Sequence, residues 1–374
     1  MTETGMKEKK NIKVIISGGG TGGHIYPAIS IANAIKEIKP EAELLFVGAD
    51  GKMEMEKVPA AGYEIVGLPI MGLHRRLTAK NLTFIFKLFR SLSKASSVIK
   101  KFKPDVAVGV GGYASGALLY KAAKMGIPCL IQEQNSYPGI TNKLLKNKAE
   151  KICVAYDDMD RFFPAEKIIH TGNPVRKDLI DVSSKKEEAL KFFNVPQGKK
   201  VVLVLGGSQG ARTLNESVLN YLDEIDKKDL FLIWQCGKFY INEMKERLQS
   251  TNQEHLMLVD FISRMDLAYA SADVIISRAG AGTISELCLV GKPVILVPSP
   301  NVSEDHQTRN AMALVSKDAA RMVSDKAARQ ALVPEVIKLK EDETLQIELS
   351  KNIIELALPN AANQIASEVL NLMK

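Results

Sequence analysis

The sequence lacks paired cysteines, long apolar runs and a leader-like start. Its four cysteines are scattered over 374 residues with no C-x-x-C pair, and its histidines have no metal-ligand spacing. This argues against a disulfide scaffold and against a zinc site. No apolar run approaches the ~20 residues of a membrane span, and the polar, lysine-rich first residues are unlike a signal peptide. We therefore expect a protein of a reducing cytosol, without a metal cofactor, that would meet a membrane only from the side.

Acidic charge is the scarcer sign, because 50 Lys and Arg outnumber 43 Asp and Glu for a net charge of +7. This balance predicts attraction to an anionic partner, and composition does not choose among nucleic acid, phospholipid and a phosphorylated substrate. A hydrophobic content of 46% with 25% charged residues is typical of soluble globular proteins. The length predicts about two domains.

One stretch near the start carries the clearest local signal. Val14–Ser17 is a β-branched apolar run that ends in the glycines from Gly18 to Gly23, and apolar residues resume at helical spacing after His24. The pattern predicts a strand, a glycine turn and a helix start. Such a turn binds anions, because free N–H groups and the positive end of the helix dipole face one point.

This glycine turn is open to several interpretations. Gly18, Gly20 and Gly23 formally match G-x-G-x-x-G, which suggests a nicotinamide nucleotide. A P-loop is excluded, because His24 stands where the Lys-Ser/Thr pair would be. His24 suits proton transfer near neutral pH, and a helix-start histidine with only a hydrogen-bonding role fits this stretch equally well.

Short apolar runs alternate with amphipathic stretches along the chain, which predicts α/β domains with parallel sheets. Gly206–Gly210 repeats the strand-to-glycine turn in the second half. Two such halves predict two domains that share a cleft at the C-terminal ends of their strands. The predicted strands are Val14–Ser17, Leu44–Val47, Val106–Val110, Cys129–Gln132, Lys151–Ala155, Val201–Leu205, Phe231–Gln235, Leu256–Val259, Val274–Ser277 and Val294–Val297.

Other loops at predicted strand ends carry candidate functional groups. Gly109–Gly116 is a second anion-capable loop in the first half, and Glu133 is either a base, an orienting carboxylate or a salt-bridged loop residue. Ser277–Glu286 predicts a helix N-terminus suited to a phosphate, where Glu286 could accept both hydroxyls of a ribose. A plain helix cap would explain Ser285 or Glu286 alone, but it would not explain the glycines.

The stretch from Met71 to Lys103 mixes apolar residues at helical spacing with cations. A core-facing helix with a solvated basic face would show the same pattern. A membrane-surface helix would need Phe84 and Phe86 to be exposed beside the cations. The candidate membrane-surface residues are Arg75, Arg76, Phe84, Ile85, Lys87 and Leu88.

Six motifs follow one another along the chain, at Gly18–His24, Gly111–Tyr113, Glu133–Asn135, Gly172–Arg176, Gly206–Ala211 and Arg278–Glu286. Together they resemble the MurG family of bacterial glycosyltransferases from Lys13 to the C-terminus, and the ordered set is far more specific than any one motif. The resemblance implies transfer of N-acetylglucosamine from UDP-N-acetylglucosamine (UDP-GlcNAc) to lipid I, the undecaprenyl-pyrophosphoryl-linked muramoyl pentapeptide. The product would be lipid II for peptidoglycan synthesis.

The resemblance also implies a fold and a location. The fold would be α/β with the GT-B architecture, in which two doubly wound Rossmann-like domains face each other across a cleft. An acceptor-binding, membrane-facing domain would cover residues 11–172 and a UDP-sugar domain residues 173–358, with a helix at 359–374 returning to the first domain. The protein would be peripheral on the cytoplasmic face of the inner membrane, with an anionic membrane surface and no nucleic acid as partner.

The family's site residues carry over by motif. Glu286 would hold the ribose hydroxyls, and the backbone near Phe261 and Ile262 would contact the uracil. The remaining implied contacts are Thr21, Gly22, Gly23 and Asn135 for the sugar or acceptor, Ser208, Ala281, Gly282, Thr283, Ile284 and Ser285 for the donor diphosphate, Arg176 and Gln307 for the nucleotide and sugar, and Gly18, Gly19, Gly20, Gly111, Gly112 and Tyr113 for the acceptor pyrophosphate.

An inverting transfer would suit this arrangement without a metal. A base takes the proton of the muramoyl 4-hydroxyl as it attacks the anomeric carbon, and fixed dipoles stabilise the leaving UDP. His24 is the first candidate for the base and Glu133 the second. Two alternatives stay open. They are a nicotinamide oxidoreductase, for which only Asp50 offers an acidic residue after the second strand, and a non-enzymatic basic protein that binds nucleic acid or anionic lipid.

Overall fold

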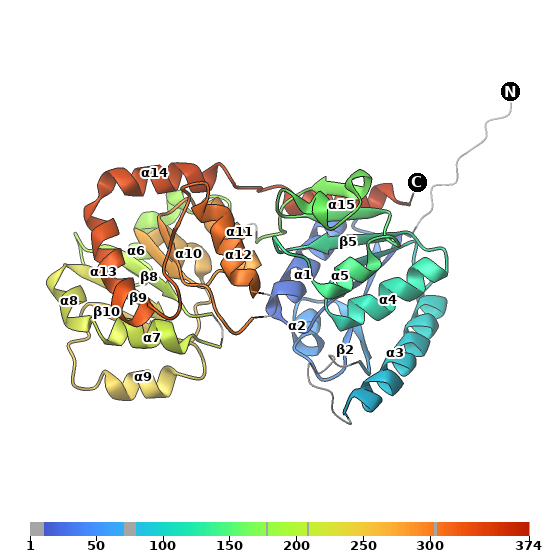
Figure 1. The fold of residues 1–374 in the computed structure, drawn as a ribbon, viewed down its shortest axis with the longest axis horizontal. Coiled ribbons are helices and arrows are strands. Elements are labelled where there is room, and N and C mark those ends of the chain that lie inside the picture. The colour runs from blue at the N-terminus through green and yellow to red at the C-terminus, as the bar shows by residue number, and fades with distance from the viewer. Residues whose placement is uncertain (1–10, 71–79, 177–178, 208, 303–304, 374) are drawn as a thin grey trace. The chain divides into compact units, whose positions relative to one another are not determined.

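A computed structural model describes residues 11–70, 80–176, 179–207, 209–302 and 305–373, with side chains from residue 86 onward in the helix that begins at Lys80. The chain forms two compact units, which we describe separately (Figure 1). The N-terminal unit comprises residues 1–175 and 360–374, and the C-terminal unit comprises residues 176–359.

The N-terminal unit is built on a seven-stranded parallel sheet in the order β3-β2-β1-β4-β5-β6-β7. Its strands are β1 (Lys13–Gly18), β2 (Glu43–Ala49), β3 (Glu64–Leu68), β4 (Val106–Gly111), β5 (Cys129–Glu133), β6 (Lys151–Val154) and β7 (Ile168–His170). Its helices are α1 (Gly22–Ile38), α2 (Glu54–Ala60), α3 (Lys80–Phe102), α4 (Tyr113–Lys124), α5 (Ile140–Leu145) and α15 (Ala361–Asn371).

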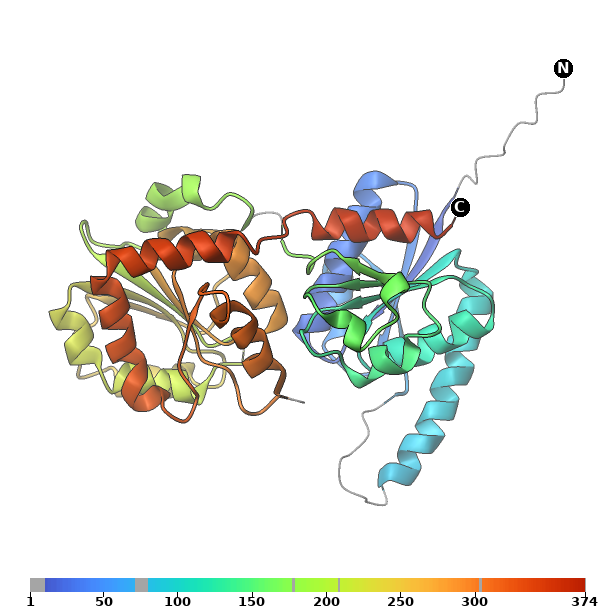
Figure 2. The same cartoon turned by 45° about the horizontal axis from the view of Figure 1, so that its top comes forward.

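Helices cover both faces of this sheet, which is why its central strands are apolar throughout. Val14 and Ile16 of β1 lie in one core with residues of α1 and α15, while Ile15 lies in the other core with residues of α3 and α4. All three side chains are fully buried. Figures 1 and 2 both show α15 beside α1, although the whole C-terminal unit separates the two helices in sequence.

The C-terminal unit has a six-stranded parallel sheet in the order β10-β9-β8-β11-β12-β13. Its strands are β8 (Lys200–Leu205), β9 (Leu230–Gln235), β10 (Leu256–Val259), β11 (Val274–Ser277), β12 (Val294–Leu296) and β13 (Arg321–Met322). Its helices are α6 (Lys186–Phe192), α7 (Arg212–Leu219), α8 (Leu222–Lys227), α9 (Ile241–Arg247), α10 (Met265–Ser271), α11 (Ala281–Val290), α12 (His306–Val315), α13 (Ala328–Glu341) and α14 (Glu343–Ile354).

The predicted α/β class with two parallel-sheet, Rossmann-like domains is confirmed. All ten predicted strands exist, with ends within two residues of the prediction. The prediction missed β3, β7 and β13, and each of these strands lies at an edge of its sheet. Among the described residues, no helix has the length and apolar character needed to cross a membrane.

Candidate active site

The two glycine loops of the N-terminal unit touch each other at the C-terminal ends of β1 and β4. The amide of Gly19 donates to the carbonyl of Gly111 at 3.4 Å. Gly112 has a φ of +91°, and a Cβ there would lie 2.6 Å from the Gly19 oxygen. Glycine is therefore required at position 112 both for its backbone conformation and for space. Tyr113 follows directly as the exposed first residue of α4.

The turn between β1 and α1 leaves only part of its backbone available to an anion. The amide of Gly20 is bound by the carboxylate of Glu54 at 3.0 Å, and Gly19 is occupied by Gly111. Within the described part of the chain, the amides of Thr21, Gly22 and Gly23 have no hydrogen-bond acceptor. These three groups at the helix start are the ones that could bind a phosphate or sugar oxygen.

His24 lies in the first turn of α1 and is held by the same loop. Its Nδ1 lies 2.9 Å from the carbonyl oxygen of Gly19. Because a carbonyl only accepts, Nδ1 carries the hydrogen, and Nε2 of the neutral ring keeps the lone pair. The ring packs against Gly111, where a Cβ would lie 2.8 Å from Nε2. The contact at Nδ1 thus fixes which ring nitrogen keeps the lone pair.

Glu133, at the end of β5, is buried and its carboxylate is fully engaged. Oε1 accepts from the backbone and side-chain amides of Asn135 at 3.0 and 3.2 Å. Oε2 accepts from the Gly139 amide at 3.1 Å and from Nδ2 of Asn142 at 2.8 Å. These contacts are typical of an orienting carboxylate, which was one of the roles that the sequence left open for Glu133.

The Gly172–Arg176 motif begins beside this loop. Asn173 accepts from Nε2 of Gln132 at 2.9 Å and donates to the carbonyl of Gln134 at 3.0 Å, and all three residues are buried. The side chain of Asn173 therefore fixes the end of β5, from which Asn135 follows.

In the C-terminal unit, Glu286 lies in the first turns of α11, next to the end of β11. Its Oε2 accepts from the hydroxyl of Tyr269 at 2.9 Å, and its Oε1 lies 3.7 Å from Nε of Arg176. Burial and the negative charge of Glu286 raise the pKa of Tyr269 well above its usual value, so this phenol stays a donor. The structure thus brings together Arg176 and Glu286, which the motifs had assigned to the same nucleotide.

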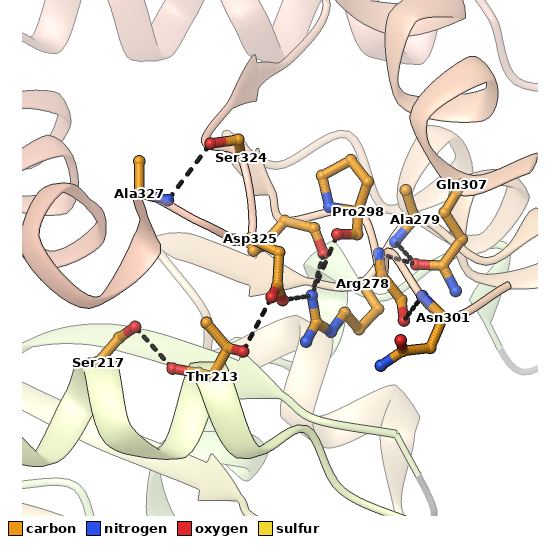
Figure 3. Close-up of polar contacts among 12 residues, drawn as sticks. Thr213, Ser217, Arg278, Ala279, Pro298, Asn301, Gln307, Ser324, Asp325 and Ala327 are labelled. Carbon is orange, nitrogen blue, oxygen red and sulfur yellow. Dashed lines mark hydrogen bonds and ion pairs between the residues drawn. The ribbon is translucent and has the colours of Figure 1, made fainter. Parts of the chain in front are cut away.

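Gln307 belongs to α12, and its side-chain oxygen is committed to the backbone. Oε1 accepts from the amide of Ala279 at 3.2 Å and from the amide of Ser299 at 2.8 Å. Figure 3 shows this oxygen facing Ala279. The loops after β11 and β12 are thereby fixed to α12, and among the described residues no acceptor bonds to Nε2 of this amide.

Arg278 connects the same loops to β13 and α7. Its guanidinium donates to the Val297 carbonyl at 2.9 Å. It also donates to Oδ1 of Asp325 at 2.6 Å, while Oδ2 of Asp325 accepts from Thr213 at 3.0 Å (Figure 3). The motif residue Arg278 is therefore used inside the protein, where it holds the loop that leads to Glu286.

The remaining predicted donor residues lie near this loop or outside the described chain. Ala281, Gly282, Thr283, Ile284 and Ser285 form the first turns of α11, where the first N–H groups of a helix have no intrahelical acceptor. Ile262, after β10, is buried beside the exposed Phe261. Ser208 falls outside the described residues.

The helix α3 has one face packed on the core and another exposed. Ala95 and Ile99 are buried, and the partly buried Leu88 packs on the same core, so Leu88 lies on the core side of this helix. A helix turns its residues 88, 92, 95 and 99 to one face. Phe86 and Phe89 are 64% and 67% exposed on the other side, near the exposed Lys87 and Arg90. Arg75 and Arg76, and the side chains of Phe84 and Ile85, lie outside the described part.

Two family models match the chain over most of its length. The N-terminal domain of glycosyltransferase family 28 matches residues 14–154, and the C-terminal domain of the same family matches residues 201–365. This chain belongs to glycosyltransferase family 28. The family assignment favours a glycosyltransferase over the two alternatives that the sequence patterns had left open, a nicotinamide oxidoreductase and a non-enzymatic basic binding protein.

Relatives and a solved structure of family 28 agree with this assignment. A protein of Parabacteroides distasonis is 56% identical over 97% of this chain and 99% of its own length, and one of Flavobacterium psychrophilum is 52% identical over 97% and 98%. Both are named UDP-N-acetylglucosamine–N-acetylmuramyl-(pentapeptide) pyrophosphoryl-undecaprenol N-acetylglucosamine transferase. The crystal structure of MurG from Acinetobacter baumannii matches with a TM-score of 0.78 at 27% identity, over 96% of this chain and 99% of that one.

Proposed function

We propose that this enzyme transfers N-acetylglucosamine from UDP-GlcNAc to the 4-hydroxyl of the muramoyl sugar of lipid I, with inversion at the anomeric carbon. The product is lipid II, which serves peptidoglycan synthesis and through it cell-wall biogenesis, cell shape and cell division. The observation that carries the proposal is the near-complete match to relatives named for this activity, at 52–56% identity.

The donor half of the proposed site lies in the C-terminal unit. Glu286 accepts the ribose hydroxyls, supported by Arg176 and Tyr269, which hold its carboxylate. The first turns of α11 and Ser208 bind the diphosphate through N–H and hydroxyl groups. Gln307 uses Nε2 for the sugar, because its oxygen is already bonded to two backbone amides. The backbone at Ile262 contacts the uracil.

The acceptor half lies in the N-terminal unit. Nε2 of His24 takes the proton as the 4-hydroxyl oxygen forms its bond to C1 of the donor sugar. The bond from C1 to the phosphate oxygen breaks, and UDP leaves with the electron pair. The unpaired amides from Thr21 to Gly23 bind the sugar or the acceptor, with Asn135 nearby on the loop that Glu133 shapes. We prefer His24 to Glu133 as the base, because Glu133 already accepts four hydrogen bonds.

The acceptor is bound to a lipid, so the enzyme must reach a membrane. We propose that it works as a peripheral protein on the cytoplasmic face of the inner membrane and contacts anionic lipid through α3. Two exposed phenylalanines beside cations on this helix support the proposal. Binding to anionic vesicles tests it.

The decisive experiment measures UDP release from UDP-GlcNAc by the purified protein, with and without a short-chain lipid I analogue and with EDTA present. Acceptor-dependent release that survives the chelator is the expected result.

His24→Ala should lower turnover by about 10²–10⁴-fold, the usual contribution of a general base, with donor binding preserved. Glu286→Ala should instead abolish most UDP-GlcNAc binding while the fold stays intact.

Each assignment has an outcome that would contradict it. Folded protein that releases no UDP with the acceptor present would refute the transferase. Wild-type turnover in His24→Ala would remove this residue as the base. Unchanged donor affinity in Glu286→Ala would remove the ribose contact.

A further inference from the structure

Glu54 is a charged residue with no exposed surface, and the proposed mechanism does not yet use it. It is the first residue of α2, and its carboxylate points to the glycine turn that precedes His24. Oε1 accepts from the backbone amide of Ala49 at 2.9 Å, and Oε2 accepts from the backbone amide of Gly20 at 3.0 Å. Each oxygen is thus paired with one backbone N–H, which a buried carboxylate requires.

The surrounding backbone is shaped to admit this carboxylate. A Cβ on Gly19 would overlap the carboxyl group of Glu54, and a Cβ on Gly48 would lie 2.5 Å from its Cγ. Both positions therefore need glycine for the space that Glu54 occupies. Gly19 is thus not explained by phosphate binding alone.

The amide that Glu54 binds belongs to the same peptide group that holds His24. The N–H of the Gly19–Gly20 peptide donates to Glu54, and the C=O of that peptide, on Gly19, accepts from Nδ1 of His24 at 2.9 Å. A peptide group is planar, so fixing its N–H also fixes the direction of its C=O. A carboxylate at the N–H also polarises the group and strengthens the carbonyl as an acceptor.

We propose that Glu54 is a positioning residue for His24 and acts through the Gly19–Gly20 peptide. This inference rests on the proposed role of His24 as the base. The carboxylate, the peptide and the imidazole form one chain of hydrogen bonds, which holds the hydrogen on Nδ1 and the lone pair on Nε2. When Nε2 takes the acceptor proton, the same chain stabilises the imidazolium. A carboxylate bonded directly to a catalytic histidine does this in hydrolases, and here one peptide group lies between them.

The variant Glu54→Gln tests this role with little change in volume. Its side chain keeps one acceptor oxygen, but its NH₂ group opposes one of the two backbone amides. We expect kcat with the lipid I analogue to fall roughly ten- to a hundredfold, which is less than the 10²–10⁴-fold contribution of a general base itself, because Glu54 acts only through the orientation of His24. The KM for UDP-GlcNAc should stay close to the wild-type value, because the proposed contacts to the nucleotide lie in the C-terminal unit. In the His24→Ala background, Glu54→Gln should cause no further fall.

The ring nitrogens of His24 give a direct readout that a merely structural role would not change. Long-range ¹H–¹⁵N spectra of histidine-labelled protein, assigned with His24→Ala, should show the Nδ1–H form in the wild type and a mixture of both tautomers in Glu54→Gln. The matched control is Asp105→Asn, because Asp105 accepts from the amide of Lys13 at 2.9 Å, at the opposite end of β1. This control should keep both kcat and the His24 tautomer.

Three outcomes would overturn the proposal. They are a folded Glu54→Gln with wild-type kcat, an equal loss with and without His24, and an Nε2–H tautomer in the wild-type protein. The last measurement needs no variant, so it decides even where Glu54→Gln fails to fold. If His24→Ala alone keeps full turnover, the proposed base fails instead, and the tautomer still reports whether Glu54 orients the ring.

Discussion

At the scale of single residues, the fully buried side chain of Tyr269 holds the carboxylate of Glu286, the residue proposed to bind the donor. Its ring lies in the core of the C-terminal unit, and only its hydroxyl reaches the carboxylate of Glu286. The raised pKa of Tyr269 keeps the hydrogen on the phenol at any pH where the protein works. Glu286 is thus held at Oε2 by a neutral donor and approached at Oε1 by a cation, Arg176.

Tyr269→Phe should weaken donor binding without changing the fold. A hydrogen bond to a charged group contributes about 1.5–3 kcal/mol, so we expect the KM for UDP-GlcNAc to rise roughly tenfold while kcat changes little. Steady-state kinetics at saturating acceptor measure both constants. Tyr221→Phe is the control, because Tyr221 in the same unit donates to the carbonyl of Gln330 at 2.8 Å on the surface. Equal KM values in the two variants would contradict the role of Tyr269.

Residues of this kind set the limit of sequence reasoning about the site. His24 and Glu286 stand in glycine-rich motifs at strand ends, so their placement could be predicted. Glu54 is one of several charged residues at the start of a helix, and Tyr269 lies in a mostly apolar stretch, so neither belongs to a recognisable motif. Their roles depend on contacts between segments distant in sequence, which no local spacing encodes.

At the scale of elements, the apolar runs predicted the central strands because both faces of those strands are covered. The edge strands β3 and β7 carry partly exposed residues, and β13 has only two residues, so none of the three forms a continuous apolar run. The sequence also did not show which face of α3 packs on the core. Apolar residues occur on both of its sides, and only packing separates Leu88, turned to the core, from Phe89, turned to solvent.

If the exposed side of α3 contacts lipid, removing its aromatic side chains should weaken membrane binding. Replacing both Phe86 and Phe89 with Ser should weaken binding to anionic vesicles by tenfold or more, since inserting one Phe side chain contributes about 1.5–3 kcal/mol. Stability should not change, because both side chains are more than half exposed. Added salt should also weaken vesicle binding by the wild-type protein, because it screens the attraction of Lys87 and Arg90 to anionic lipid.

Co-sedimentation with vesicles of known anionic lipid content measures this effect. Phe239→Ser is the matched control, because Phe239 is 73% exposed in the C-terminal unit. If the control lowers vesicle binding as much as the α3 double variant, α3 is not the lipid-binding element.

At the scale of the whole molecule, two separate segments of the chain, residues 1–175 and 360–374, form the N-terminal unit. Ile365 and Val369 of α15 have no exposed surface and complete the core on α1. Replacing both with Ala should destabilise the N-terminal unit by about 4 kcal/mol, as expected for buried Ile and Val truncations. The stability of the C-terminal unit should stay the same.

Two probes separate the units in a urea titration. Trp234 is the only tryptophan of the sequence, and it is buried in the C-terminal unit, so its fluorescence reports that unit alone. Far-UV circular dichroism reports both. We expect an earlier transition by dichroism and an unchanged midpoint by fluorescence. The exposed Gln364→Ala is the control and should leave both curves unshifted. A fluorescence midpoint that moves with the core variant would contradict this independence.

The return of α15 also sets an order in time. A ribosome makes the chain from its N-terminus, and domains generally fold as they emerge. The N-terminal unit cannot complete its core until every residue from Arg176 to Pro359 has been translated, because α15 comes after them. The apolar side of α1 that Ile365 will cover stays open to chaperones for that period. The half of the enzyme that is synthesised second is therefore the half that can finish folding first.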